Sequence, residues 1–233
     1  MDEMDRVRSL PLFPLDLVLF PHMLVPLHIF EERYRQLVRR CTETGETFGI
    51  VLATGQDPDD AGPSGVRTAP VGCVARIVRC DLLPDGRYNL HVEGGDRFRI
   101  VDTHESEPYR TGLVMPFEDE LVDPVDIPEE IGRMQDALSG FLKLQMERLG
   151  QEVGELSLPD DPGILGFTAS CILPVENPVK QELLELRDPA ERLRRAEALL
   201  ADANRMLQRR PAPARKVFDR IDIPRFAKFR CRN

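Results

Sequence analysis

Residues 71–93, VGCVARIVRCDLLPDGRYNLHVE, decide the fold class, because they hold two strand patterns joined by a turn. In the turn Pro84-Asp85-Gly86, the proline fixes φ and the glycine accepts the positive φ of a tight reversal. After the turn, Tyr88, Leu90 and Val92 alternate with other residues, which is the period of a strand with one buried face. The stretch therefore predicts a β-hairpin.

Further strand patterns flank this hairpin on both sides. Upstream, short apolar runs occupy residues 10–20, 24–30 and 48–53, and the prolines in the first run favour short or edge strands. Residues 54–69 are dense in Gly, Pro and Asp and predict a loop. Downstream, Gly94-Gly95 predicts another reversal before the strand patterns at 98–100 and 113–115. Many short strands between turns are typical of a compact barrel or a folded-over sheet.

Helical spacing appears once inside this β-rich half and dominates the second half. Over residues 31–40 a helix is expected, with one apolar face that consists of Phe30, Tyr34, Leu37, Val38 and Cys41. In the second half, Asp126 followed by Glu129 predicts a capped helix that ends near Gly150. Two further helix starts are predicted at Asn177-Pro178 and at Asp188-Pro189, each a capping residue followed by proline.

The charge is unevenly distributed along the 233 residues. The net charge is −9, yet residues 209–233 carry nine basic and two acidic residues, a net charge of +7 that leaves −16 on the rest. An acidic body argues against a protein that coats nucleic acid over its whole surface. No apolar run is long enough to span a membrane, and the acidic start of the chain is unlike a secretory signal, so a cytoplasmic location is expected.

The sequence contains none of the common catalytic or metal-binding motifs. Its five cysteines form no Cys-x-x-Cys pair, and neither Gly-x-Ser-x-Gly nor His-Glu-x-x-His occurs. Residues 163–166, GILG, have the spacing of an RNA-clamping loop, but their isoleucine and leucine favour burial. We therefore expect no catalytic, metal or cofactor site. A cysteine nucleophile paired in space with a histidine is the enzymatic alternative.

Four ordered stretches resemble the N-terminal domain of the Lon protease family. They are LPLFPLD (10–16) with VLFPHM (18–23), VGCVARI (71–77), the hairpin 83–94 with Arg97-Phe98, and KQELLE (180–185) with Arg192-Leu193. The resemblance covers residues 8–207. It implies an α+β fold: a β-rich, PUA-like pseudo-barrel lobe followed by a C-terminal helical bundle. The expected boundaries are 8–118 for the β lobe, 119–208 for the helical lobe of the same domain and 209–233 for a basic tail.

Lon proteases continue into an ATPase module and a Ser–Lys protease. This sequence has no Gly-Lys dipeptide, and hence no phosphate-binding loop of the Gly-x-x-x-x-Gly-Lys type. Only 26 residues follow Leu207. The expectation is a free-standing, non-enzymatic relative of the Lon N-terminal domain, without the motor and the peptidase.

The family's N-terminal domain contributes to recognising unfolded or damaged protein segments, which implies a peptide- or protein-binding surface here. The candidate residues lie on a proline-bound segment and on the helix that follows it, and they are Phe20, Pro21, His22, Met23, Glu32, Arg33 and Arg35. An extended peptide would gain main-chain hydrogen bonds at an exposed strand edge. The competing interpretation is that Phe20, Met23 and Tyr34 only join the β lobe to the helix. The expected partners are unfolded polypeptides, or a protein for which the chain is an adaptor.

RNA or another nucleic acid is the alternative partner. PUA-like folds elsewhere hold RNA, and Phe218, Phe226 and Phe229 alternate with the bases of the tail, where they could stack on unpaired nucleotides. The tail could instead dock on the acidic body of its own chain. The sequence predicts no oligomeric state.

Overall fold

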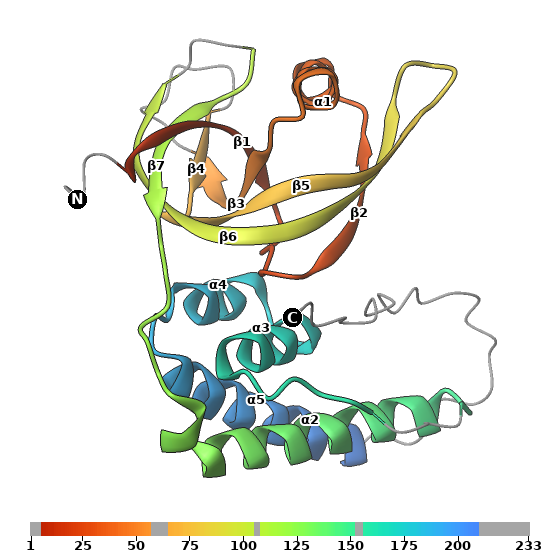
Figure 1. Cartoon of the computed structure of the whole chain (residues 1–233). Helices are drawn as coiled ribbons and strands as arrows, with labels where there is room; N and C mark the ends of the chain where they lie inside the picture. The colour runs from red at the N-terminus through yellow and green to blue at the C-terminus, as the bar shows by residue number, and fades with distance from the viewer. Residues whose placement is uncertain (1–5, 57–64, 105–107, 152–155, 210–233) are drawn as a thin grey trace.

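The computed structural model describes residues 6–56, 65–104, 108–151 and 156–209, and Figure 1 shows them as a β lobe above a helical lobe. The predicted α+β class is confirmed. The basic tail beyond Arg209 lies outside the described residues.

Over the described residues, the β lobe is a seven-stranded sheet that closes on itself. Its strands are β1 (Arg8–Leu15), β2 (Leu24–Ile29), β3 (Phe48–Gln56), β4 (Val66–Thr68), β5 (Val71–Leu82), β6 (Tyr88–His104) and β7 (Thr111–Pro116). The antiparallel order β1-β7-β6-β5-β3 becomes a ring because β1 also pairs with β3 in parallel. β2 lies on β6 beside this ring, and β4 lies on β3.

The predicted hairpin is the joint between β5 and β6. Its turn is closed by the Gly86 N–H, which donates to the Leu83 carbonyl at 2.9 Å, and Gly86 has a φ of 81°. Tyr88, Leu90 and Val92 are all buried, as their alternation predicts. The predicted loop 54–69 is shorter than expected, because β3 continues to Gln56 and residues 66–68 form β4; residues 57–64 lie outside the described part.

The predicted reversal at Gly94-Gly95 is wrong, because β6 runs through both glycines without interruption. The reason for a glycine here is the backbone of residues 20–23, which crosses β6 at this point. The His22 N–H donates to the Gly94 carbonyl at 2.8 Å, and the Gly94 N–H donates to the Met23 carbonyl at 2.9 Å. A Cβ at position 94 would lie 2.0 Å from the carbonyl oxygen of Phe20, so only glycine fits.

Helix α1 (Glu32–Thr44) covers the open end of the β lobe (Figure 1). It buries Tyr34, Leu37, Val38 and Cys41, as predicted. Phe30 was expected on this face, but its side chain is 63% exposed. The helix begins only at Glu32 after an extended N-cap at Glu31, so Phe30 precedes the helix and lies outside its register.

The helical lobe contains α2 (Pro128–Arg148), α3 (Pro162–Ile172), α4 (Asn177–Glu185) and α5 (Pro189–Arg209), with the short 3₁₀ helix η2 (Pro124–Asp126) before α2. Asp126 does not cap α2 as predicted; Ile127 holds the N-cap position. Asn177 is the first residue of α4 rather than its cap, and its side-chain amide donates to Asp16. The predicted start at Asp188 does have a cap bond, because the Asp188 carboxylate accepts from the Ala190 N–H at 2.8 Å. Helix α3 was not predicted.

The two lobes share an apolar core. Phe20 and Val71 from the β lobe pack with Leu165, Leu184 and Leu193 from the helices. The rings of Phe20 and Phe167 lie 6.3 Å apart. The orientation of the lobes is therefore set by burial rather than by a flexible linker. Within the described residues, no helix is long and apolar enough to cross a membrane.

Candidate functional site

A groove opens in the β lobe where the ends of β1 and β2 meet the first turn of α1. Its volume is about 270 Å³, and it is open to solvent. We call it the β1–α1 groove. It is lined by Phe13, Pro14, Leu15, Asp16, His28, Ile29, Phe30, Glu31, Arg33, Tyr34, Ala53 and Val66. Most of these side chains are apolar and a few charged groups lie among them, as in a site that binds apolar ligands and orients them with polar contacts.

The floor of the groove is aromatic and rigid. The ring centres of Phe13 and Tyr34 lie 4.0 Å apart, and the ring centres of Phe13 and Phe48 lie 6.3 Å apart. The Arg33 guanidinium lies 4.6 Å from the centre of the Tyr34 ring, and its Nη2 is 2.8 Å from Glu31 Oε2. These contacts hold a cation and an aromatic face at the edge of the groove.

The rim of the groove combines an exposed aromatic side chain with a strand edge. Phe30 extends into solvent beside the His28 ring, and the two ring centres are 6.3 Å apart. Among the described strands, β2 pairs only with β6, in the register Leu24↔Glu93 to Ile29↔Tyr88. The other edge of β2 therefore offers backbone donors and acceptors to an extended chain.

The structure divides the predicted binding residues into two places. Phe20 is fully buried in the core between the lobes. A partner at the surface therefore cannot contact its side chain, and its position agrees with the competing interpretation that it joins the β lobe to the rest of the chain. Met23 packs against the same core, and both Met23 and Pro21 are half-buried. His22 is exposed, and its backbone has a left-handed conformation (φ 64°). None of these four residues lines the β1–α1 groove.

Of the three candidate residues on α1, only Arg33 lines the groove. Glu32 is exposed and forms an ion pair with Arg35 at 2.8 Å. Arg35 is half-buried, and its Nε donates to the Gly86 carbonyl at 2.7 Å. Arg35 thus ties α1 to the β5–β6 turn, which is a structural contact.

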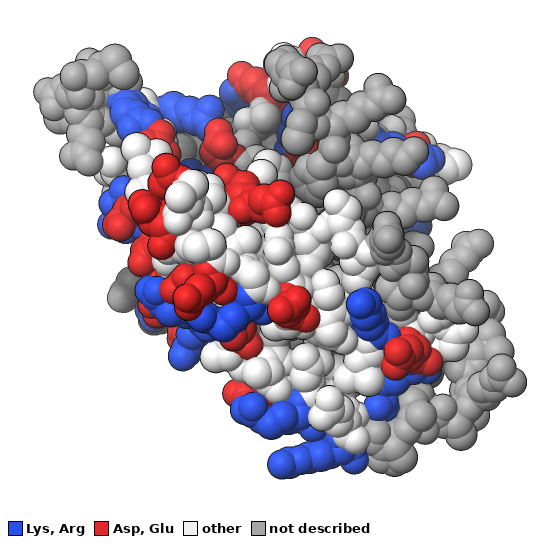
Figure 2. All heavy atoms as spheres, turned by 60° about the horizontal axis from the view of Figure 1, so that its bottom comes forward, with Lys and Arg blue, Asp and Glu red and all other residues white. Residues whose placement is uncertain are grey.

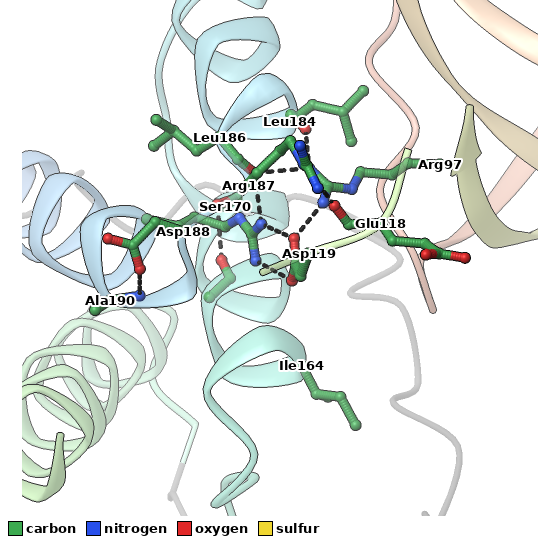
Figure 3. Close-up of polar contacts among 12 residues, drawn as sticks. Arg97, Glu118, Asp119, Ile164, Ser170, Leu184, Leu186, Arg187, Asp188 and Ala190 are labelled. Carbon is green, nitrogen blue, oxygen red and sulfur yellow. Dashed lines mark hydrogen bonds and ion pairs between the residues drawn. The ribbon is translucent and has the colours of Figure 1, made fainter. Parts of the chain in front are cut away.

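A second polar cluster lies where the lobes join, and sequence reasoning missed it (Figure 3). Arg97 of β6 and Arg192 of α5 both bind Asp119, and Arg192 Nη1 is 2.9 Å from Asp119 Oδ2. Arg97 Nη1 and Arg192 Nη2 also donate to the Leu186 carbonyl, at 2.7 and 2.6 Å. The Arg192 side chain is completely buried, and its guanidinium lies 3.9 Å from the centre of the Phe167 ring.

This buried cluster joins the two lobes, because both guanidiniums bind the same carboxylate and the same Leu186 carbonyl, although Arg192 Nε has no hydrogen-bond partner in the described residues. Burial lowers the pKa of Arg97 to about 10, which leaves the guanidinium charged at neutral pH. One carboxylate and the carbonyls at the end of α4 compensate two buried cations.

The alternatives based on thiols and metals gain no support from the described residues. Burial raises the pKa of the Cys41 thiol to about 11 and that of Cys171 to about 12, so both stay protonated at neutral pH. Within the described ranges, no group of three or more His, Cys, Asp or Glu side chains could hold a metal ion. Gly163–Gly166 lies in α3 and packs against the core, as its apolar residues indicated.

The fold is that of a Lon N-terminal domain. A crystal structure of a Lon N-terminal domain protein from Xanthomonas campestris superposes with a TM-score of 0.59 at 28% identity, over 82% of this chain and 98% of that one. The N-terminal domain of Lon protease from the Mycobacterium avium complex shares the fold, with a TM-score of 0.62 at 22% identity over 84% of this chain and 99% of that one.

The chain belongs to the family described as the ATP-dependent protease La (LON) substrate-binding domain, whose model matches residues 9–202. The Lon proteases of Trichlorobacter lovleyi and Lawsonia intracellularis are each 31% identical to it, over 88% and 79% of this chain. Those matches cover 25% and 22% of the relatives, so the chain spans about a quarter of their length.

Proposed function

We propose that this chain is a non-enzymatic protein-interaction module that binds extended, apolar polypeptide segments in the β1–α1 groove. The observation that carries the proposal is the aromatic floor of Phe13 and Tyr34 beside the edge of β2 that no described strand pairs with. Main-chain hydrogen bonds to β2 would supply affinity without regard to sequence, and the groove would select apolar side chains. Membership of a substrate-binding family supports the same role.

The groove is large enough for one or two apolar side chains of a partner. Burying such a side chain is worth about 1.5–3 kcal/mol. Binding at a single groove of this size is therefore weak and tolerant, which suits recognition of unfolded segments or the action of an adaptor.

We expect Phe30→Ser to weaken binding about tenfold, because Phe30 is the exposed apolar side chain on the rim of the groove. The measurement is fluorescence anisotropy with a labelled, reduced and carboxymethylated model protein that stays unfolded. Leu82→Ser is the matched control, since Leu82 is equally exposed (64%) but lies on the β5–β6 hairpin and does not line the groove.

Arg33→Ala should also weaken binding, by removing the cation that covers Tyr34. Arg35→Ala is expected to act on stability instead, through the lost bond to Gly86. If wild-type protein fails to bind, or if Phe30→Ser and Leu82→Ser bind equally, the groove is not the binding site.

Nucleic-acid binding through the basic tail stays a prediction, because residues 210–233 lie outside the described part. Its test is a salt titration of RNA affinity, which should fall steeply between 50 and 200 mM salt if several phosphates are contacted. Affinity that is independent of salt would contradict it.

A further inference from the structure

The connector between the two lobes, residues 118–126, exposes two large apolar side chains. It has the sequence EDELVDPVD and joins β7 to α2. Leu121 is completely exposed and Val125 is 80% exposed. The connector is anchored to the helical lobe at Glu120, whose N–H donates to the Arg187 carbonyl at 2.9 Å. Leu121 and Val125 are thus two exposed apolar side chains four residues apart on a connector that is anchored at Glu120.

The connector that carries these two side chains has five acidic residues, of which two are paired. Glu118 forms an ion pair with Arg6, and Asp119 belongs to the buried cluster. In the described part of the chain, Glu120, Asp123 and Asp126 have no basic partner within ion-pair distance. In Figure 2, acidic side chains with some basic ones among them lie on the side where the connector lies in Figure 1, next to a wide uncharged area. This surface fits a partner that is both basic and apolar.

The chain itself contains such a partner in residues 216–230, KVFDRIDIPRFAKFR. Their basic residues alternate with Phe218, Phe226 and Phe229, so the segment matches the connector in both charge and apolarity. We propose that residues 216–230 dock on the connector of the same chain. The bases then face Glu120, Asp123 and Asp126, and apolar side chains cover Leu121 and Val125.

The geometry of α5 permits this docking within one chain. The 21 residues of α5 span about 31 Å, and its first turn lies beside the connector, where Arg192 Nη1 donates to Asp119 Oδ2 at 2.9 Å. Residues 210–215 contain Pro211 and Pro213 and reach about 19 Å when extended. The segment itself adds up to about 50 Å, so it can run back along α5 to the connector.

Because residues 216–230 are attached to the same chain, they are favoured over RNA or a second copy of the chain as the partner of the connector. A tethered segment has an effective concentration in the millimolar range, so modest complementarity is enough. RNA is repelled by the acidic connector. A second copy of the chain must displace a segment that is already attached.

The test is limited trypsin digestion of the full-length chain, followed by mass spectrometry, because the segment is rich in cleavage sites. We expect cleavage within residues 216–230 to be at least fivefold slower in wild type than in the double variant Leu121→Ser, Val125→Ser. The triple variant Glu120→Lys, Asp123→Lys, Asp126→Lys should also be cleaved faster than wild type. Higher salt should accelerate cleavage of wild type, since the charge pairs are exposed.

The matched control is Val78→Ser with Leu82→Ser, which removes two exposed apolar side chains from the β5–β6 hairpin and should leave the cleavage rate unchanged. Equal rates in wild type and both connector variants would overturn the proposal. Protection that depends on protein concentration would also overturn it, in favour of docking between two chains. Either result leaves the proposed β1–α1 groove untouched, because the connector does not line it.

Discussion

The variant Asp119→Ala should unfold at much lower urea concentration than wild type, with a loss of about 3 kcal/mol in the free energy of unfolding. Asp119 is the only carboxylate that Arg97 and Arg192 contact in the described structure, and both guanidiniums are almost inaccessible to water. Without it, two buried cations keep only carbonyl acceptors and aromatic faces. The Asp119 side chain is itself partly exposed, which places the expected loss at the lower end of the range for broken buried ion pairs.

Urea unfolding followed by circular dichroism measures this loss. Asp126→Ala is the control on the same connector, and a change below about 0.5 kcal/mol is expected for this exposed residue. A double-mutant cycle of Asp119→Ala with Arg192→Met should show a coupling energy above about 1 kcal/mol, because the two side chains bind each other directly. If Asp119→Ala lowers the free energy of unfolding by less than about 1 kcal/mol, the cluster does not stabilise the contact between the lobes.

Local sequence patterns were enough to predict much of the fold. The hairpin of β5 and β6 follows from the turn at residues 84–86 and from the alternation after it, both of which act between near neighbours in the chain. The buried face of α1 follows from helical spacing in the same way. The resemblance to the Lon N-terminal domain then supplied the order of the two lobes, and the shared fold of the two solved structures agrees with it.

The buried cluster could not be predicted, because charged side chains are almost always exposed and the sequence does not show which of them meet. Arg97 and Arg192 lie 22 and 73 residues away from Asp119 in the chain. A weak signal was present, since Arg192 falls on the otherwise apolar face of α5 with Leu193 and Ala196. That signal becomes informative only once α5 is known to pack against α3 and the end of α4.

The β1–α1 groove itself was not predicted, for a similar reason. Arg33 was among the candidate residues because the first helix was considered as a whole, but Phe13 and Ile29 are brought to it by the ends of two strands. No strand pairing joins β1 to β2, so no local pattern links these residues. Phe20 was a candidate for surface binding although it is buried, because the pattern of an apolar residue next to proline is equally compatible with the core and with the surface.

The position that most constrains the contact between the β2 region and β6 is Gly94. We expect Gly94→Ala to lower the free energy of unfolding by about 3 kcal/mol or more, at the upper end of the cost of overpacking. The added Cβ would lie 2.0 Å from the Phe20 carbonyl oxygen and 2.9 Å from the Phe20 carbonyl carbon. A backbone group cannot move away by changing a rotamer, and here the Phe20 carbonyl accepts from the Met23 N–H at 3.1 Å while His22 and Met23 are themselves hydrogen-bonded to Gly94.

The neighbouring glycine supplies the matched control. At Gly95, a Cβ would meet only Val74, at 3.6 Å, which is an ordinary van der Waals contact. Neither glycine has a positive φ, so the two alanine variants differ in packing alone. Gly95→Ala should therefore stay within about 1 kcal/mol of wild type, since its entropic effect favours the folded state. Equal losses in the two variants would show that the close crossing of residues 20–23 over β6 does not limit stability, and the explanation given for the unbroken strand would fail.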